Sequence, residues 1–172
     1  MLYTGKGDTG ETGLFGVCER FSKDGPLFEA LGGIDELNSW LGVCYAKADS
    51  RELADSIRAI QEDLFVVQAQ LAGSDKKINV MQVERLEREI AQIGSHLKPP
   101  TSFVIAGATE TSALLDYARA LARRAERAVI RAHSSAAAPE MLKYLNRLSS
   151  VLYALARYEA QKSGAEEEKP TY

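Results

Sequence analysis

The sequence contains little cysteine and little histidine, with two residues of each type among 172. Cys18 and Cys44 are too few for a disulfide framework. Together with His96 and His133 they show neither the spacing of a zinc site nor that of a nucleophilic pair. No metal ligand is therefore assigned by a direct motif.

Features of membrane and nucleic-acid proteins are also lacking. No apolar run approaches the about 18 residues that a membrane-spanning helix needs, and the opening residues show no signal-peptide pattern. With 24 acidic and 21 basic residues the net charge is −3, whereas a general nucleic-acid binder has a basic excess. We expect a cytoplasmic protein that binds neither nucleic acid nor membrane.

Helical spacing of apolar residues covers most of the chain, with no long alternating pattern of the kind that predicts strands. Five helices are predicted, over residues 26–48, 51–72, 80–97, 109–133 and 139–162. Asp24, Ser50 and Asn79 are the expected N-caps of the first three, and Gly73 is expected to end the second. The predicted fold class is all-α, a helical bundle.

The chain is predicted to be a single domain over residues 1–172 with three parts. A glycine-rich segment (1–22) comes first, the helical bundle (24–163) follows, and an acidic tail (164–172), expected to be frayed, comes last.

The opening stretch TGKGDTGETGLFG (4–16) combines five glycines with threonine hydroxyls and one lysine. These groups could form an anion-binding nest, but a disordered tail would have a similar composition. The stretch lacks the GxxxxGK[ST] pattern of a P-loop, and it does not follow a strand as a dinucleotide fingerprint does.

The fourth predicted helix carries a basic face in the run ARALARRAER (118–127). At helical spacing, one side contains Arg119, Arg123, Glu126 and Arg127. The opposite side is the predicted core face and contains Leu114, Ala118, Leu121, Ala125 and Val129. A charged helix face is usually solvated, with weak ion pairs. Because arginine favours bidentate contact with phosphates and carboxylates, a bound anion or an acid from another helix is the alternative.

Two further helices carry polar candidates. The fifth is predicted to expose a polar stripe opposite its leucines, formed by Asn146, Ser150, Tyr153 and Arg157. On the first, Asp35 follows the pair Gly32–Gly33, which is predicted to permit close packing or a local bend. Asp35 is either a surface acid or the partner of an arginine on another helix.

Taken together and in order, three parts of the chain resemble the ATP:cob(I)alamin adenosyltransferases of the propanediol-utilisation type. They are TGKGDTGETGLFG, SKDGPLFEALGGIDELNSWLG, and the pair ARALARRAER and YLNRLSSVLYALAR. The resemblance implies a ferritin-like four-helix core plus one helix, assembled as a homotrimer with active sites between adjacent subunits. It implies transfer of the 5′-deoxyadenosyl group of ATP to the cobalt of a reduced corrinoid, cob(I)alamin, which releases triphosphate and forms adenosylcobalamin.

Substrates and site residues are implied by the same resemblance. Besides ATP and the reduced corrinoid, it implies Mg²⁺ at the phosphates, with K⁺ as a further candidate, and hand-over of the product to a B12-dependent enzyme. The expected catalytic residues are Arg123, Arg119 and Asp35, with Asp35 paired to Arg119, and Phe103 is expected to pack under the corrin ring. The expected ATP contacts are Thr4, Gly5, Lys6, Gly7, Asp8, Thr9, Gly10, Thr12, Lys23, Glu29, Arg123, Arg124, Glu126, Arg127 and Asn146.

The chain departs from the family pattern on the corrinoid side. It reads VIAGA (104–108) where the family often has a proline and paired glycines, and Asp116 stands where a histidine is frequent. Two alternative functions stay open at this point: a non-catalytic ATP- or corrinoid-binding carrier or sensor, and a structural bundle whose arginines meet an acidic partner protein.

Overall fold

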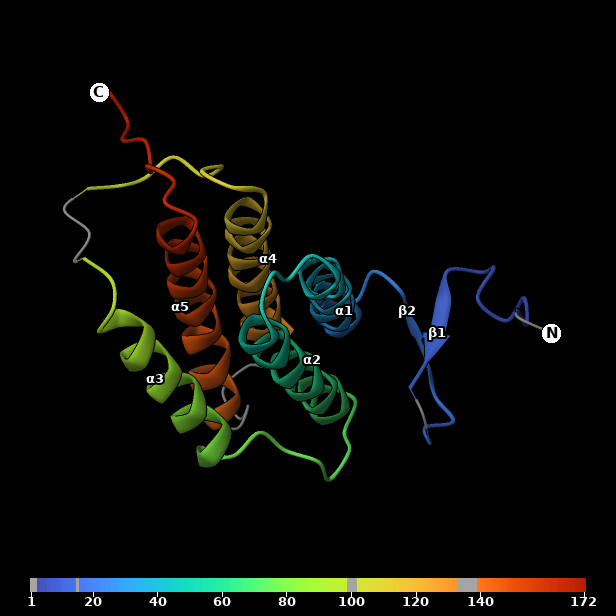
Figure 1. Ribbon diagram of the computed structural model, residues 1–172. Helices are drawn as coiled ribbons and strands as arrows, with labels where there is room; N and C mark the ends of the chain where they lie inside the picture. Colours follow the sequence, from blue (N-terminus) through green and yellow to red (C-terminus); the bar gives the residue numbers. More distant parts are fainter. Residues whose placement is uncertain (1–2, 15, 99–101, 133–138) are drawn as a thin grey trace.

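The computed structural model describes residues 3–14, 16–98, 102–132 and 139–172. These residues form five helices: α1 (Pro26–Ala46), α2 (Arg51–Leu71), α3 (Val80–Gly94), α4 (Glu110–Ala132) and α5 (Pro139–Lys162). Helix α4 packs against α1 and α5, while α2 packs against α1 and α3 packs against α5 (Figure 1). The predicted all-α bundle is confirmed.

Most predicted helix starts agree with the structure. The Ser50 hydroxyl accepts a hydrogen bond from the Leu53 backbone N–H (3.3 Å), and Asn79 forms a reciprocal capping box with Gln82. The predicted cap at Asp24 is wrong, because Gly25 is the N-cap of α1. The Asp24 carboxylate instead accepts a hydrogen bond from the Ser22 hydroxyl (2.5 Å).

The predicted helix ends lie one to three residues too far along the chain, at 48, 72 and 97 instead of 46, 71 and 94. Gly73, with φ of +89°, follows the C-cap of α2, so its predicted role as a stop is confirmed. Helix α4 begins one residue later than predicted, after Thr109, which caps it by accepting from the Ser112 N–H (3.1 Å). The predicted end of the fourth helix at His133 lies outside the described residues.

The core is an apolar cluster to which all five helices contribute. The predicted core faces of α4 and α5 are buried, except that Leu114 is only partly so. Gly33 faces α4, and a methyl group at this position would lie 3.6 Å from Cα of Ala125, which is ordinary van der Waals contact. Gly32 faces open space, so the packing of α1 requires a glycine at neither position.

The glycine-rich segment contains a short hairpin rather than a plain loop. Strands β1 (Glu11–Gly13) and β2 (Arg20–Ser22) pair antiparallel, and the hairpin projects away from the bundle (Figure 1). Basic side chains hold the preceding turn. Arg20 donates to the carbonyls of Lys6 (2.6 Å) and Glu11 (2.9 Å), and Lys23 donates to that of Gly7 (2.7 Å).

The acidic tail is docked, which corrects the prediction that it frays. The Ile105 N–H donates to the Glu168 carbonyl (2.8 Å), and Glu167 forms an ion pair with Arg157 (2.9 Å). A charged tail without apolar residues to pack against the bundle is expected to fray. Here the buried Arg157 holds the tail through its ion pair with Glu167. In the described part of the chain no helix combines the length and apolar character that crossing a membrane requires.

Candidate functional site

A cavity of about 560 Å³ lies beside the basic face of α4. Arg119 and Arg123 reach it from α4, and Ser149, Ser150 and Tyr153 reach it from α5. The other lining residues are Ile90 and Gly94 of α3, Leu97 and Lys98 just beyond it, and Ala154. The cavity therefore combines cationic and hydroxyl groups with an apolar wall.

Arg119 lines this cavity with a partly buried guanidinium group. Its Nε is buried and has no hydrogen-bond partner among the described residues. A buried polar group without a partner is costly, so this guanidinium is suited to an anion or acceptor that one chain does not supply. Arg123, one turn further along α4, is exposed and lines the same cavity.

Glu126 and Asn146 lie further along the same side of α4 and α5. The Asn146 amide donates to the Glu126 carboxylate (3.3 Å), and its carbonyl accepts from Arg147 (2.9 Å). Arg147 in turn bonds to Glu87 of α3 (2.9 Å). Glu126 thus bonds to Asn146 of the neighbouring helix. Arg127 is exposed.

The neighbouring arginines of the RRAER run are divided between two sides of α4. Arg123 lines the cavity with α5, whereas Arg124 forms an ion pair with Glu36 of α1. Both side chains of this pair are about half exposed, at 52% and 49%. Within one chain, Arg124 therefore lies on a different side of α4 from the cavity that Arg119 and Arg123 line.

Asp35 also lies away from the cavity arginines. In the described part of the chain its carboxylate accepts a hydrogen bond from Gln68 of α2 (3.4 Å) and is not paired with Arg119. Asp35 is exposed and faces α2, whereas Arg119 faces α3 and α5. The expected pair does not form within one chain, so it would need a second copy.

None of the described residues of the opening segment lines the cavity. Of its expected ATP contacts, most are exposed on the projecting hairpin and its preceding turn, and Gly7 and Thr12 are half-buried. Lys23 and Glu29 are exposed near the start of α1. The ring of Phe21 lies 5.9 Å from that of Phe28, which links the hairpin to α1.

Phe103, the expected corrinoid contact, is 78% exposed on the connection between α3 and α4. Near it lies a second cavity of about 520 Å³, which is lined by Ser102, Val104 and residues of the tail. Leu97, Lys98 and Tyr153 line both cavities, so the two are neighbours on one face.

A buried ion pair beside these cavities was missed by sequence reasoning. Arg157 of α5 bonds to Asp116 of α4, and their side chains are only 7% and 8% exposed. The prediction that Arg157 lies on an exposed polar face is therefore wrong. No local pattern indicates this pair, because it joins two helices through residues 41 positions apart in the sequence.

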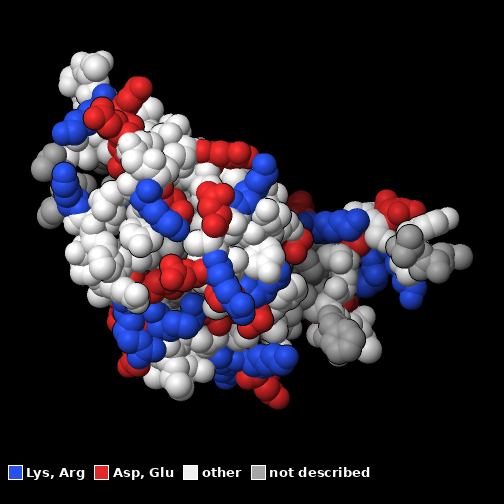
Figure 2. Space-filling view, viewed as in Figure 1, with Lys and Arg blue, Asp and Glu red and all other residues white. Residues whose placement is uncertain are grey.

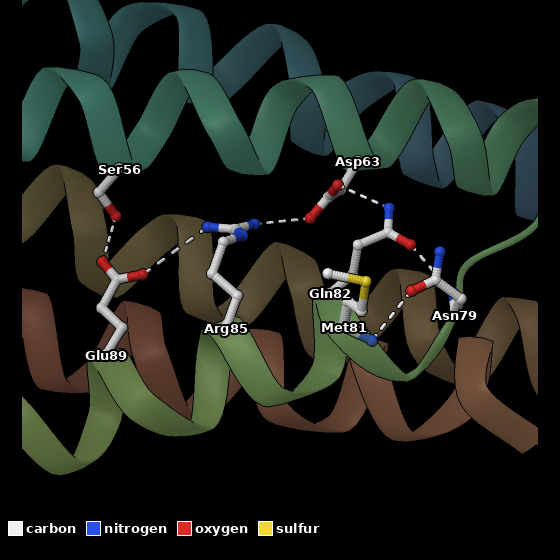
Figure 3. A network of polar contacts seen from close by, with 7 residues as sticks. All are labelled: Ser56, Asp63, Asn79, Met81, Gln82, Arg85 and Glu89. Atoms are coloured by element: carbon white, nitrogen blue, oxygen red, sulfur yellow. Dashed lines mark hydrogen bonds and ion pairs between the residues drawn. The ribbon is translucent and has the colours of Figure 1, made fainter.

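A second polar network joins α2 to α3 (Figure 3). Asp63 accepts hydrogen bonds from Arg85 (2.6 Å) and Gln82 (2.7 Å), and Glu89 accepts one from Ser56. Burial alone would lower the pKa of Arg85, but the hydrogen bond and charge of Asp63 outweigh it, so the pKa is raised. Burial also raises the pKa of the neighbouring Tyr144 well above its usual value.

Charges of both signs alternate over the face of the molecule seen in Figure 2. On that face no broad basic field is visible, which agrees with the composition. Among the described residues no group of three or more His, Cys, Asp or Glu side chains could hold a metal ion.

Comparison with known proteins gives consistent matches. The family model described as cobalamin adenosyltransferase matches residues 2–159. A corrinoid adenosyltransferase of Citrobacter freundii is 40% identical over 166 residues, which cover 92% of this chain and 94% of that protein. The corrinoid adenosyltransferase PduO of Salmonella typhimurium is 37% identical over 92% of this chain. The chain spans about half of that longer relative, 49% of its length.

Solved structures agree with the sequence matches. A phenylalanine-to-alanine variant of the PduO-type ATP:corrinoid adenosyltransferase from Lactobacillus reuteri, complexed with cobalamin and ATP, has a TM-score of 0.90. It is 28% identical, and the match covers 100% of both chains. An arginine-to-lysine variant of the same enzyme, complexed with ATP, also has a TM-score of 0.90.

Proposed function

Because this chain belongs to the cobalamin adenosyltransferase family, we propose that it transfers the 5′-deoxyadenosyl group of ATP to the cobalt of a reduced corrinoid. The observation that carries the proposal is the cavity beside α4. Arg119, whose Nε has no partner among the described residues, and the exposed Arg123 lie at positions that match the family's arginine motif. A polyphosphate is the anion that this motif implies.

The proposed reaction needs no nucleophile from the protein. Cobalt(I) attacks C5′ of ATP, a carbon–cobalt bond forms, and the C5′–O bond breaks. Its electron pair leaves with triphosphate, and cobalt becomes formally cobalt(III). The absence of a Cys–His or Ser–His pattern from the sequence fits this chemistry.

The chain's own task is to stabilise charge and to hold the reacting atoms. Arg123 would bind the leaving triphosphate, where preorganised cations are most effective, and Arg119 would pair with Asp35 of another copy. Holding C5′ in line with cobalt can contribute about 7–11 kcal/mol to lowering the barrier. Phe103 is exposed beside the second cavity, where it could pack under the corrin ring and exclude water and the lower axial ligand.

A dedicated metal cluster is not required for Mg²⁺. This ion usually keeps several waters and is held by one or two carboxylates together with phosphate oxygens. Glu126, on the same side of α4 as Arg123, is the carboxylate that would hold it beside bound ATP. The ion would supply charge neutralisation at the triphosphate.

We further propose a homotrimer in which each site lies between adjacent subunits. Two separations within one chain support it. Asp35 faces α2 while its expected partner Arg119 faces α3 and α5, and the hairpin projects away from the bundle (Figure 1). A second copy would bring these groups together. Hand-over of the product to a B12-dependent enzyme remains part of the proposal.

The opening segment (3–14) is expected to become more ordered over bound triphosphate. Lys6 and Lys23, together with its glycines and threonines, would then contact the phosphates. Hydrogen exchange of this segment with and without MgATP measures the change. Equal protection in both states would contradict the proposed role.

The deciding experiment mixes the purified protein with ATP and chemically reduced cobalamin and follows the absorbance spectrum. Formation of adenosylcobalamin together with triphosphate supports the transferase. Binding of both ligands without formation of the carbon–cobalt bond would identify the carrier or sensor instead. No thermal shift with ATP would favour the structural bundle, because a ligand at about 100 times its Kd should add about 2.7 kcal/mol of stability.

A further inference from the structure

Three charged residues from separate parts of the chain meet beside the second cavity. Arg157 of α5 lies between Asp116 of α4 and Glu167 of the tail, bonded to the first and 2.9 Å from the second. Its guanidinium also lies 5.1 Å from the centre of the Tyr153 ring. We call Asp116, Arg157 and Glu167 the tail lock.

The geometry of arginine explains why this residue type serves at the centre. A guanidinium offers several N–H groups in a fixed fork, so it can contact two carboxylates at once. Because Arg157 is 7% exposed, leaving it without any carboxylate partner would be costly in this setting. Asp116 supplies the buried partner within the bundle, and Glu167 brings the tail to the same group.

The tail is bonded in turn to the segment that carries Phe103. The residue after Glu167 accepts the Ile105 N–H through its backbone carbonyl (2.8 Å). Residues of this segment and of the tail line one cavity together with Arg157. A continuous path of contacts therefore runs from α4 through α5 and the tail to the segment 102–105.

We infer that the tail lock docks the tail (164–172) and so holds the segment 102–105 in place, which makes Arg157 and Glu167 positioning residues for the corrinoid. The inference rests on the proposed function, because it takes Phe103 as the corrinoid contact. Asp116 stands one turn before Arg119 on α4. The lock thus joins the corrinoid side to the helix that carries the proposed triphosphate site.

Glu167→Gln tests this without disturbing the bundle, since Asp116 continues to neutralise Arg157. The matched control is Glu166→Gln, which removes the same charge from the exposed neighbouring residue. In Glu167→Gln the Ile105 amide should exchange about tenfold faster, and the KM for the reduced corrinoid should rise about fivefold. The KM for ATP and the melting temperature should match those of the control.

The possible outcomes separate cleanly. If Glu167→Gln behaves like Glu166→Gln in both exchange and corrinoid KM, the lock does not position the segment. If the KM values for ATP and corrinoid rise together, the effect is general and the inference is wrong. If the unaltered protein forms no adenosylcobalamin, the proposed function fails. The exchange rate of the Ile105 amide then still decides whether the tail holds the segment.

Discussion

Two polar regions of the molecule use similar residues and differ in how far the chain satisfies them. Between α2 and α3, the carboxylate of Asp63 accepts hydrogen bonds from Arg85 and Gln82, so the charges meet partners within the chain. Beside α4, the Nε of Arg119 is buried without a partner among the described residues, and Arg123 is exposed. The first region joins two helices, whereas the second has a buried arginine nitrogen without an acceptor among the described residues.

The comparison shows that residue type alone does not identify a site in this protein. Arg85 and Arg119 are both partly buried arginines on helices of the same bundle. What separates them is the location of the nearest acceptor, which is a property of the packing. Substitutions in the first region should therefore change stability, and those in the second should change turnover.

The largest effect is expected for Arg85→Ala. It would leave Asp63 largely buried, with a side chain 12% exposed, and without its ion-pair partner. Because Arg85 is itself 31% exposed, we expect a loss of about 2 kcal/mol, below the range for fully buried pairs. Thermal unfolding should show a fall of about 4–8 °C. The exposed Arg88→Ala is the control, and an equal fall in both variants would contradict the structural role of the network.

Arg123→Ala should lower the turnover rate and leave the stability nearly unchanged. Loss of one charge contact to the departing triphosphate should lower the turnover rate at least about tenfold, equivalent to about 1.4 kcal/mol. The melting temperature should stay close to that of the unaltered protein, because Arg123 is exposed. Arg131→Ala, in the last turn of the same helix, is the control. Near-normal turnover of Arg123→Ala would contradict the proposed contact between Arg123 and the triphosphate.

A smaller effect is expected for Asp35→Asn. If Asp35 pairs with Arg119 of another copy, kcat/KM for the reduced corrinoid should fall about threefold to tenfold with little change in stability. Gln68→Ala removes the hydrogen bond that Asp35 accepts within its own chain, and it should leave kcat/KM unchanged. A variant of Asp35 that fails to fold would make this residue structural instead.

The smallest effect concerns Glu159 on α5, a buried acid whose nearest cation, Lys162, is 3.8 Å away. Burial raises the pKa of Glu159, and the charges of Asp49 and Glu52 add to this against the opposing effect of Lys162. The folded state thus binds more protons than the unfolded state. Stability should fall as pH rises from the ordinary glutamate pKa through the raised one.

Glu159→Gln removes this titration. The variant should melt about 1–3 °C higher than the unaltered protein near neutral pH, and the difference should vanish in acid where Glu159 is protonated. Melting curves of both proteins across this pH range measure the effect. A difference that persists unchanged in acid would assign it to a cause other than ionisation.

The sequence predicted the helices well because their signals are local. Ser50 and Asn79 cap helices through side chains that bond to backbone groups two or three residues away. The apolar faces of α4 and α5 follow directly from helical spacing. The cap at Asp24 failed for a local reason too, because Ser22 offers its carboxylate a competing hydrogen bond.

The candidate site was predicted less completely, since its geometry depends on distant contacts. Helical spacing placed Arg119 and Arg123 on one side, and the structure puts both on one cavity. Spacing could not reveal that Arg124 bonds to Glu36, which lies 88 residues away in the sequence. It also could not reveal that Arg157 bonds to Asp116, 41 residues away. Such pairs depend on how the helices pack against one another.

The two thiols of the chain differ sharply in reactivity because of where the fold puts them. Cys18 is exposed between β1 and β2, whereas Cys44 is buried in α1, where burial raises the pKa of its thiol to about 11. A thiol-reactive fluorophore should therefore attach to the hairpin and spare the bundle. The unmodified sequence thus offers a single-label optical probe at the segment that is expected to meet the nucleotide.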